Sequence, residues 1–217
     1  MTACTVLLAV LLFVSGCTAP DSEEWQDRQE LLEPVVFTEV TEAFAEKDDG
    51  TGTPLWLFRT NDSRYIRPDG DTLWRITDSG TSSSVSAVTR RNSGCAAAGY
   101  GIVFSARKRA GQTYLLCVMI NTLQQYSIGR YAAGEYSEIQ KWTHSRLLKG
   151  GYGVANRIGV EYSAASQSFT LTLNGGLETV FRDTGAPRLS TGASGYAVTV
   201  LPYEGFPERY AEVVFGR

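Results

Sequence analysis

Apolar residues alternate with polar residues through most of the chain, and this period of two constrains the fold more than any other feature. The alternation is clearest over residues 100–104, 158–162 and 169–173. Successive side chains of a β-strand point to opposite faces, so this pattern is typical of strands with one buried face. Beyond Pro54 no stretch has the 3.6-residue period of an amphipathic helix. We therefore expect an all-β domain.

Turn signals between these runs indicate antiparallel pairing. Asn174-Gly175 predicts a two-residue hairpin turn, because both turn positions favour positive φ. A turn near Ala110-Gly111 would place Cys117 opposite about residue 103. Many short antiparallel strands favour two packed sheets, as in a β-sandwich or jelly roll. The other strand-like runs lie near residues 55–59, 72–77, 84–90, 113–120, 124–131, 177–182, 195–201 and 210–215.

The order of several segments narrows this architecture. They are GYGIVF (99–104), YLLCVMI (114–120), YSIGRY (126–131), Trp142 with Ser145, NRIGV (156–160), FTLTLNG (169–175), 192–198 and AEVVF (211–215). The succession resembles the concanavalin A-like, laminin-G-like jelly roll of bacterial exported proteins. The resemblance implies one antiparallel β-sandwich over residues 55–217. That superfamily includes lectins, glycoside hydrolases and adhesive modules, so the fold alone does not choose a function.

Nine consecutive apolar residues, Val6–Val14, lie near the start of the chain. This is the length of a signal-peptide core and is well short of the roughly 20 residues that span a bilayer. The following residues, Ser15-Gly16-Cys17, resemble the bacterial lipobox, whose cysteine receives a diacylglycerol and becomes the mature N-terminus. Met1–Cys4 departs from the usual pattern, since it contains no Lys or Arg. The alternatives are a plain secretory signal and a buried N-terminal strand.

The lipobox resemblance implies a signal peptide over residues 1–16 and a lipid anchor on Cys17. Stable anchoring needs more than one acyl chain, palmitate among them. We therefore expect a lipoprotein of the bacterial cell envelope that faces the periplasm or the cell exterior. Some bacterial lipoproteins are held at the inner membrane by an Asp directly after the lipidated cysteine. This chain has Thr18 at that position, which slightly favours a location away from the inner membrane.

Charge divides the chain that follows the signal peptide. Residues 21–49 hold eleven Asp and Glu against Arg28 and Lys47, a net charge of −9. Residues 50–217 hold eighteen Lys and Arg against twelve acids, a net charge of +6. We interpret residues 17–54 as an acidic tether, which contains either a short helix through Leu31-Leu32 or a first strand at residues 35–37.

Two cysteines remain for the folded domain once Cys4 has left with the signal peptide and Cys17 is acylated. Cys95 and Cys117 either form one disulfide or stay as two buried free thiols. The hairpin register places Cys117 opposite residue 103 rather than 95, so local pairing does not predict a bridge. Neither cysteine has the CxxC spacing of a redox or zinc site.

Several reaction classes lack their residues. One histidine and a formal net charge of −3 leave no His-rich metal cage and no basic excess for a nucleic-acid binder. The Glu-Asp-Glu strand signature of jelly-roll hydrolases is absent, and Glu135 and Glu138 on one strand would point to opposite faces. Neither a GxSxG elbow nor a phosphate loop occurs. We expect no cofactor; calcium at Asp62, Asp69 and Asp71 is the alternative to an ordinary turn.

Aromatic residues beside Gly-rich connections carry the binding prediction. Exposed aromatic faces with hydrogen-bonding neighbours suit a sugar-binding surface. The alternative is that these aromatics pack in the core. We expect the candidate ligand-binding residues in loops; they are Tyr131, Tyr136, Tyr152, Arg130 and His144.

Other conspicuous side chains have ordinary explanations. Trp142 and Asn156, at matched positions of the family pattern, are expected to pack and to fix a loop. Arg90-Arg91 and Arg107–Arg109 are expected on solvated turns, with acidic glycans or phosphates as alternative partners.

The sequence thus predicts a lipid-anchored envelope protein whose jelly roll binds glycan or another envelope component without catalysis. The alternatives are a glycan-active hydrolase on the same scaffold and a structural lipoprotein that contacts other proteins.

Overall fold

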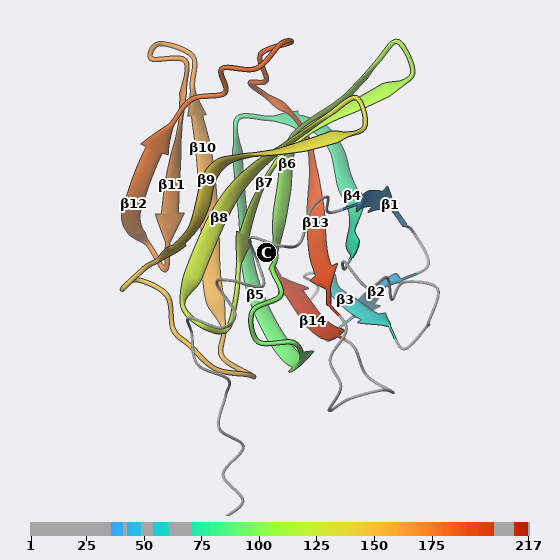
Figure 1. The fold of residues 1–217 in the computed structure, drawn as a ribbon, viewed down its shortest axis with the longest axis vertical. Coiled ribbons are helices and arrows are strands. Elements are labelled where there is room, and N and C mark those ends of the chain that lie inside the picture. The colour runs from blue at the N-terminus through green and yellow to red at the C-terminus, as the bar shows by residue number, and fades with distance from the viewer. Residues whose placement is uncertain (1–35, 41–42, 49–53, 61–70, 202–210, 217) are drawn as a thin grey trace, which may run out of the picture. The chain divides into compact units, whose positions relative to one another are not determined.

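The computed structural model describes residues 36–40, 43–48, 54–60, 71–201 and 211–216. In these residues all regular structure is β, and two seven-stranded sheets lie face to face (Figure 1). The signal peptide, Cys17, the alternative helix near Leu31-Leu32, and Asp62 and Asp69 lie outside the described residues. None of the described residues forms a helix long and apolar enough to cross a membrane.

Each sheet is built from strands that are distant in sequence. The first sheet has the order β1 (Val36–Glu39), β4 (Asp71–Ser82), β13 (Gly192–Val200), β6 (Tyr100–Arg109), β7 (Gln112–Ile120), β8 (Gln125–Ala132) and β9 (Glu135–His144). The second has the order β12 (Gly176–Phe181), β11 (Ser168–Leu173), β10 (Asn156–Ser163), β5 (Ser84–Gly94), β14 (Ala211–Gly216), β3 (Pro54–Thr60) and β2 (Phe44–Asp48). All these pairings are antiparallel except that of β1 with β4, which is parallel.

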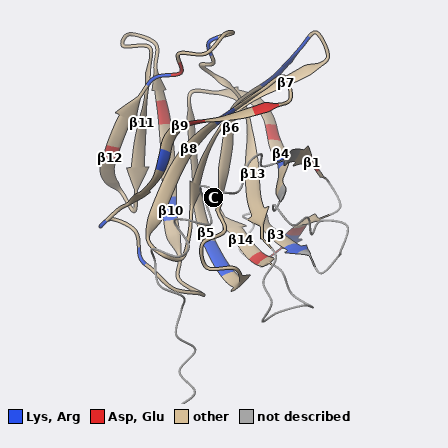
Figure 2. Cartoon of the chain, in the orientation of Figure 1, with Lys and Arg blue, Asp and Glu red and all other residues tan. Residues whose placement is uncertain are grey.

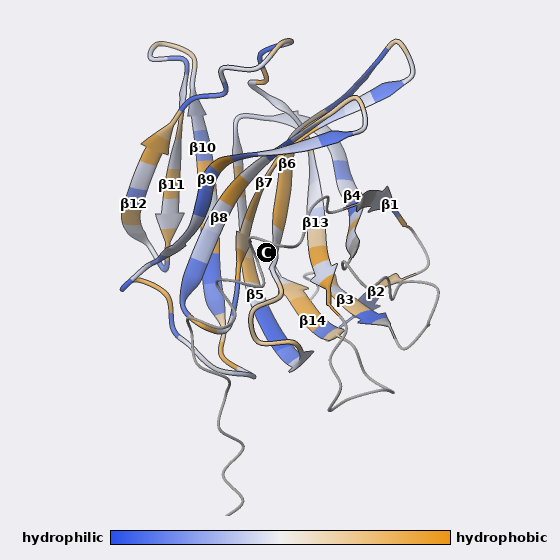
Figure 3. Ribbon diagram, viewed as in Figure 1, coloured by the Kyte–Doolittle hydropathy of each residue, from blue (hydrophilic) through white to orange (hydrophobic). Residues whose placement is uncertain are grey.

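The main core fills the space between the sheets. Ile102 and Phe104 of β6 point into it from the first sheet, and Phe169 points into it from β11. The Phe104 and Phe169 rings meet edge to face with centroids 5.5 Å apart. Burying one such ring stabilises the fold by about 2 kcal/mol. The central strand β6 is largely hydrophobic in Figure 3. In agreement with this, Figure 2 shows few charged residues on the central strands.

Both hairpin predictions are confirmed. Asn174 and Gly175 join β11 to β12 with φ of 51° and 84°. Ala110 and Gly111 join β6 to β7 with φ of 50° and 77°, and Cys117 lies opposite Val103. Positive φ at both central positions matches the right-handed twist of the strands.

Two strands extend the sandwich into the stretch that the sequence assigned to the tether. β1 includes residues 36 and 37, where the sequence left a first strand open. β2 was not expected. Phe44 of β2 is 2% exposed, and its ring packs edge to face on Phe58 of β3 at 4.9 Å. This burial accounts for the pairing of β2 with β3 despite the acidic composition.

The sequence also missed β9. Its apolar residues fall on both faces, since Ile139 packs toward the main core whereas Tyr136 and Trp142 pack on the outer side. The register against β8 also shifts twice, which adds residues to β9. A period of two is therefore invisible in EYSEIQKWTH.

Arg91 corrects the prediction that Arg90-Arg91 is a solvated turn. Both residues lie on β5, and the Arg91 side chain is fully buried. Its guanidinium donates to the carbonyl oxygens of Cys95, Gly99 and Thr199 at 2.9, 3.1 and 3.3 Å. Burial lowers the pKa of Arg91, and the ring of Tyr100 lies 5.1 Å from the guanidinium carbon. Arg91 therefore ties together the end of β5, the start of β6 and β13.

Candidate functional site

The outer face of the first sheet carries a second apolar cluster, which we call the outer-face cluster. A sheet with one face on the core commonly presents polar residues to solvent on the other face, so an apolar cluster there is unusual. Its buried members are Trp74, Val103, Ala106, Leu115, Cys117, Met119 and Ala197; its partly buried members are Ile76, Tyr131, Tyr136, Trp142 and Ala193.

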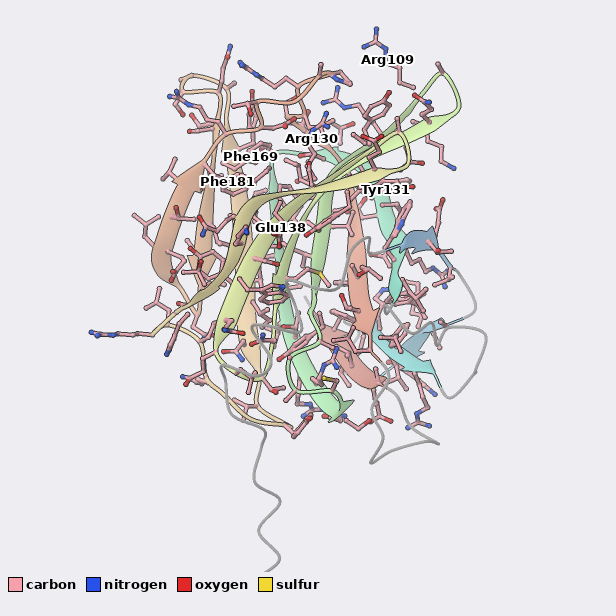
Figure 4. The ribbon with its side chains drawn as sticks, viewed as in Figure 1. Arg109, Arg130, Tyr131, Glu138, Phe169 and Phe181 are labelled. Carbon is pink, nitrogen blue, oxygen red and sulfur yellow. The ribbon has the colours of Figure 1, made fainter. Side chains whose placement is uncertain are left out.

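A Tyr–Tyr pair lies at one end of this face. Tyr131 of β8 and Tyr136 of β9 are direct cross-strand partners, and Leu115 of β7 lies opposite Tyr131 on the other side. The two tyrosines flank the β8–β9 turn, where Ala133 and Gly134 have φ of 56° and 101°. Figure 4 shows Tyr131 toward this hairpin end of β8. The structure thus brings together two predicted residues, on strands rather than in the expected loops.

Tyr136 lies across the neighbouring strand. A Cβ built on Gly129 of β8 would come within 2.2 Å of the Tyr136 hydroxyl oxygen and 2.3 Å of its ring. The hydroxyl interacts with Cys117 and Ser127, and burial is the main cause that raises the pKa of Tyr136. Cys117 lies opposite Gly129 and is 0% exposed. The absence of a side chain at Gly129 is therefore what lets Tyr136 lie flat on the sheet.

Glu138 places a carboxylate beside these rings. It lies two residues beyond Tyr136 on β9 and opposite Gly129, so it shares the outer face. Partial burial raises the pKa of Glu138, and the nearby Lys141 opposes this shift. In Figure 4 Glu138 lies near the middle of the first sheet. Glu135 lies on the opposite face of β9, as the spacing of the two acids predicted.

Two tryptophans extend the cluster along the sheet. The Trp142 ring packs close to Gly99 and Met119, where a Cβ built on Gly99 would come within 3.1 Å of the ring. Trp74 of β4 is 3% exposed, and its buried indole N–H has no hydrogen-bond partner among the described residues. A buried donor without a partner is uncommon in proteins. Trp74 therefore contributes to the packing of the cluster and does not present its N–H at the surface.

Arg130 does not belong to this face. Arg130 precedes Tyr131 on β8, so the two side chains point to opposite faces of the sheet. Arg130 is buried on the inner side, where its Nε lies 3.0 Å from the Asp183 carboxylate. It also donates to the carbonyl oxygen of Pro187 at 3.1 Å. Arg130 thus holds the segment after β12 onto the sandwich.

Tyr152 and His144 lie away from the Tyr–Tyr pair. His144 is the exposed last residue of β9, opposite Gln125 at the start of β8, and not a loop residue as expected. Tyr152 lies between β9 and β10 and is 47% exposed, and its hydroxyl donates to the carbonyl oxygen of Gly94. The five candidate residues therefore do not form one site.

Asn156 fixes the loop between β9 and β10, as its matched position predicted. Its buried side chain accepts from the Lys149 N–H at 2.8 Å and donates to the Lys149 carbonyl oxygen at 2.9 Å. Trp142 packs in the outer-face cluster, also as predicted.

The pairing left open between Cys95 and Cys117 is not made, since both are buried free thiols. Cys95 follows β5 of the second sheet, whereas Cys117 faces Tyr136 on the outer side of the first sheet. The two side chains therefore belong to different layers. Burial raises the pKa of Cys117 to about 12.

The outer face offers aromatic rings and one carboxylate to a ligand. Partly exposed tyrosine rings and the carboxylate of Glu138 match the needs of a polyhydroxylated ligand. A retaining glycosidase needs two carboxylates about 5 Å apart. Among the described residues, no second acid contributes to the pKa shift of Glu138. The described part of the chain also holds no cluster of three His, Cys, Asp or Glu that could bind a metal.

Sequence reasoning considered Glu138 only as a catalytic carboxylate and not as a binding residue, and it did not single out Gly129 or Trp74. Ala133-Gly134 is a hairpin turn, so a strand begins after it. On that strand Tyr136 and Glu138 are two residues apart, and this spacing places them on one face. Gly129 carried no signal that distinguishes it from other strand glycines.

No protein-family model and no curated protein matches the sequence. Solved structures do match. The GH16 protein of the Bacteroides ovatus mixed-linkage glucan PUL, in complex with its G4G4G3G product, is 5% identical with a TM-score of 0.53 over 89% of this chain and 88% of that one. The β-glucanase of Bacillus licheniformis is 7% identical with a TM-score of 0.50 over 85% of each chain. The carbohydrate-binding module CBM66 from Bacillus subtilis is 14% identical, with a TM-score of 0.47 over 82% of this chain and 95% of that one.

At these identities the likeness shows the fold alone. It agrees with the two facing sheets and with the succession of segments in the sequence. The chain therefore has a jelly-roll β-sandwich fold.

Proposed function

We propose that this chain is a lipid-anchored protein of the bacterial cell envelope that binds glycan, without catalysis, on the outer-face cluster. The observation that carries the proposal is the cross-strand pair Tyr131–Tyr136 with Glu138 beside it. Apolar ring faces stack on the C–H faces of sugars, while a carboxylate accepts hydrogen bonds from the hydroxyl groups. Two solved structures of the same fold act on or bind glucans according to their descriptions, which supports glycan as the ligand class.

The choice of binding over hydrolysis rests on the carboxylates. Burial raises the pKa of Glu138, and the nearby Lys141 opposes this shift. Glycoside hydrolysis needs a second carboxyl at a defined distance from the first. A release of reducing ends from any bound glycan that is lost in Glu138→Gln would contradict the non-catalytic proposal.

Binding is tested with a glycan array probed with the purified chain. Tyr131→Ala removes a partly buried ring of the cluster, and Glu138→Gln removes the charge while keeping the shape. Tyr152→Ala is the matched control, because it removes an exposed ring away from the Tyr–Tyr pair. We expect the first two variants to lose binding and the control to keep it. Loss in the control alone, or no glycan bound by the parent chain, would overturn the proposed site.

The lipid anchor is tested separately on Cys17. Cells that express the chain are fed radiolabelled palmitate, and the label should appear on the parent chain and not on Cys17→Ser. Cys95→Ser is the control for a cysteine within the folded domain. Label on Cys17→Ser would contradict the anchor at this residue and leave the glycan proposal untouched.

A further inference from the structure

We propose that Arg107, Arg109 and Arg188 form a second site, which binds an anionic group carried on a glycan. The site lies at the hairpin end of the sandwich and is separate from the outer-face cluster. Only the choice of glycan as the carrier rests on the proposed function.

The fold brings these arginines together from two distant segments. Arg107 and Arg109 lie two residues apart on β6, so they share one side of the β6–β7 hairpin. This hairpin projects beyond the body of the sandwich (Figure 1), and Figure 4 shows Arg109 at its tip. Arg107 donates to the carbonyl oxygen of Arg188 at 3.1 Å. That bond shows that this side of the hairpin faces the segment after β12.

The segment that carries Arg188 is firmly held. The Asp183 carboxylate accepts from the N–H groups of Gly185 and Leu189 at 3.0 and 2.6 Å. It also pairs with Arg130 beneath the segment. Asp183 is 2% exposed, so its charge is used inside the fold. The segment therefore presents Arg188 from a fixed support.

The three arginines have no carboxylate partner among the described residues. Arg188 donates to the neutral side chain of Gln167 at 2.7 Å, and Arg109 is exposed. The Nε–H of Arg107 is buried and has no hydrogen-bond partner in the described part of the chain. Lys108 points to the other side of the hairpin, where it lies 3.6 Å from Glu39. The side that bears the arginines thus keeps its positive charge (Figure 2).

The residue type indicates the ligand. A guanidinium offers a planar fork of donors that fits carboxylate, sulfate or phosphate oxygens two at a time. The Arg107 guanidinium contacts the backbone of Arg188, so arginines of the hairpin and of the segment meet there rather than on one flat strand. This geometry favours a single anionic substituent on a polymer over the surface of a membrane. Tyr131 lies at the same end of the first sheet, because it flanks the β8–β9 turn beside β7. The arginines of the hairpin share the face of Tyr114, opposite to the outer face that bears Tyr131, so the two sites are separate surfaces at one end of the sheet.

The test compares dextran sulfate with unmodified dextran. The full chain, purified in mild detergent, is titrated with each polymer at about 0.1 M salt, where charges farther than about 10 Å apart are largely screened. The variant Arg109→Gln/Arg188→Gln removes two charges from exposed positions. The control Arg146→Gln/Lys149→Gln removes the same charge from exposed positions beyond the opposite end of β9. We expect at least about tenfold weaker binding of dextran sulfate by the first variant and less than about twofold by the control.

Three outcomes would decide against the site. An equal loss in the control would show that only net charge matters. No binding of dextran sulfate by the parent chain would also overturn the site, as would Arg-dependent binding confined to phosphatidylglycerol-containing micelles. Tyr131→Ala is run in parallel on neutral glycans. If neutral glycans are not bound but dextran sulfate binds through the arginines, the outer-face proposal fails and this site stands as an anion site.

Discussion

The ring of Tyr136 occupies the space that a side chain at Gly129 would need, on the strand next to its own. This contact packs the Tyr136 ring over Gly129 on the outer face, beside the buried Cys117. The geometry of the proposed glycan site therefore depends on one glycine that touches no ligand.

Gly129→Ala should displace Tyr136 and weaken glycan binding. The added methyl group meets a ring rather than the end of a flexible chain, so we expect a loss of about 1–3 kcal/mol in the free energy of unfolding. Urea denaturation measures the stability, and the glycan array measures the binding. Gly216→Ala is the control, because a Cβ there meets no atom within 4 Å. Unchanged stability and binding in Gly129→Ala would show that Tyr136 does not need this contact.

Glu138 should make the fold less stable as the pH rises. Its pKa is raised in the folded chain, so between its unfolded value near 4.5 and its folded value the native state binds more protons than the unfolded state. Stability therefore falls with rising pH through this window. Glu138→Gln removes the effect, and its melting temperature should exceed that of the parent chain above the window and match it more closely below pH 4. Thermal unfolding from pH 3.5 to 7 measures the difference.

The control for this pH series is Glu135→Gln on the opposite face of β9. It removes an exposed carboxylate from the same strand, so it reports the effect of net charge alone. A gain in Glu135→Gln equal to that in Glu138→Gln would assign the pH dependence to net charge and not to burial on the outer face.

The alternation of apolar residues was enough to predict the sandwich, because it records which face of a strand is buried. The Asn174-Gly175 turn and the opposition of Cys117 to Val103 followed from local rules. The outer-face cluster could not be predicted in the same way, because its residues make both faces of the first sheet apolar. A strand that is buried on both faces has no alternation of apolar and polar residues, and the buried part of β7 is an example.

Adjacent residues show the same limit for the functional side chains. Arg130 and Tyr131 are neighbours in sequence, yet one is buried against Asp183 and the other lies on the outer face. Proximity along a strand places side chains on opposite faces, so a list of nearby polar and aromatic residues cannot define a site. Only the register between β8 and β9 brought Tyr131, Tyr136 and Glu138 together.

Arg91→Ala should destabilise the fold severely, whereas Arg90→Ala should not. The Arg91 guanidinium satisfies three carbonyl oxygens in a buried region, and its removal leaves them without donors. We expect a loss of about 3–5 kcal/mol, enough to prevent folding of a marginal domain. Arg90 is exposed on the same strand, so its replacement should change stability by less than about 0.5 kcal/mol. Equal effects of the two variants in urea denaturation would contradict the burial of Arg91.

Tyr136→Ala should make the thiol of Cys117 reactive. In the parent fold the thiol is buried beneath the ring, and burial raises its pKa to about 12, so little thiolate exists at pH 8. Removing the ring opens Cys117 to solvent and lowers this desolvation. In a chain with Cys4 and Cys17 replaced by serine, labelling with a disulfide reagent followed by mass spectrometry of peptides should detect modification at Cys117. The parent chain should label only as fast as it unfolds.

Cys95 serves as the internal reference for this experiment, because it is buried at a different place and has no contact with Tyr136 among the interactions described. Rapid labelling of both cysteines in Tyr136→Ala would mean that the variant unfolds rather than opens locally. Tyr152→Ala removes a ring from the loop between β9 and β10, and neither cysteine should be labelled in this variant. Selective labelling of Cys117 would establish that Tyr136 covers the sheet in solution, which is the position from which its ring is proposed to meet a glycan.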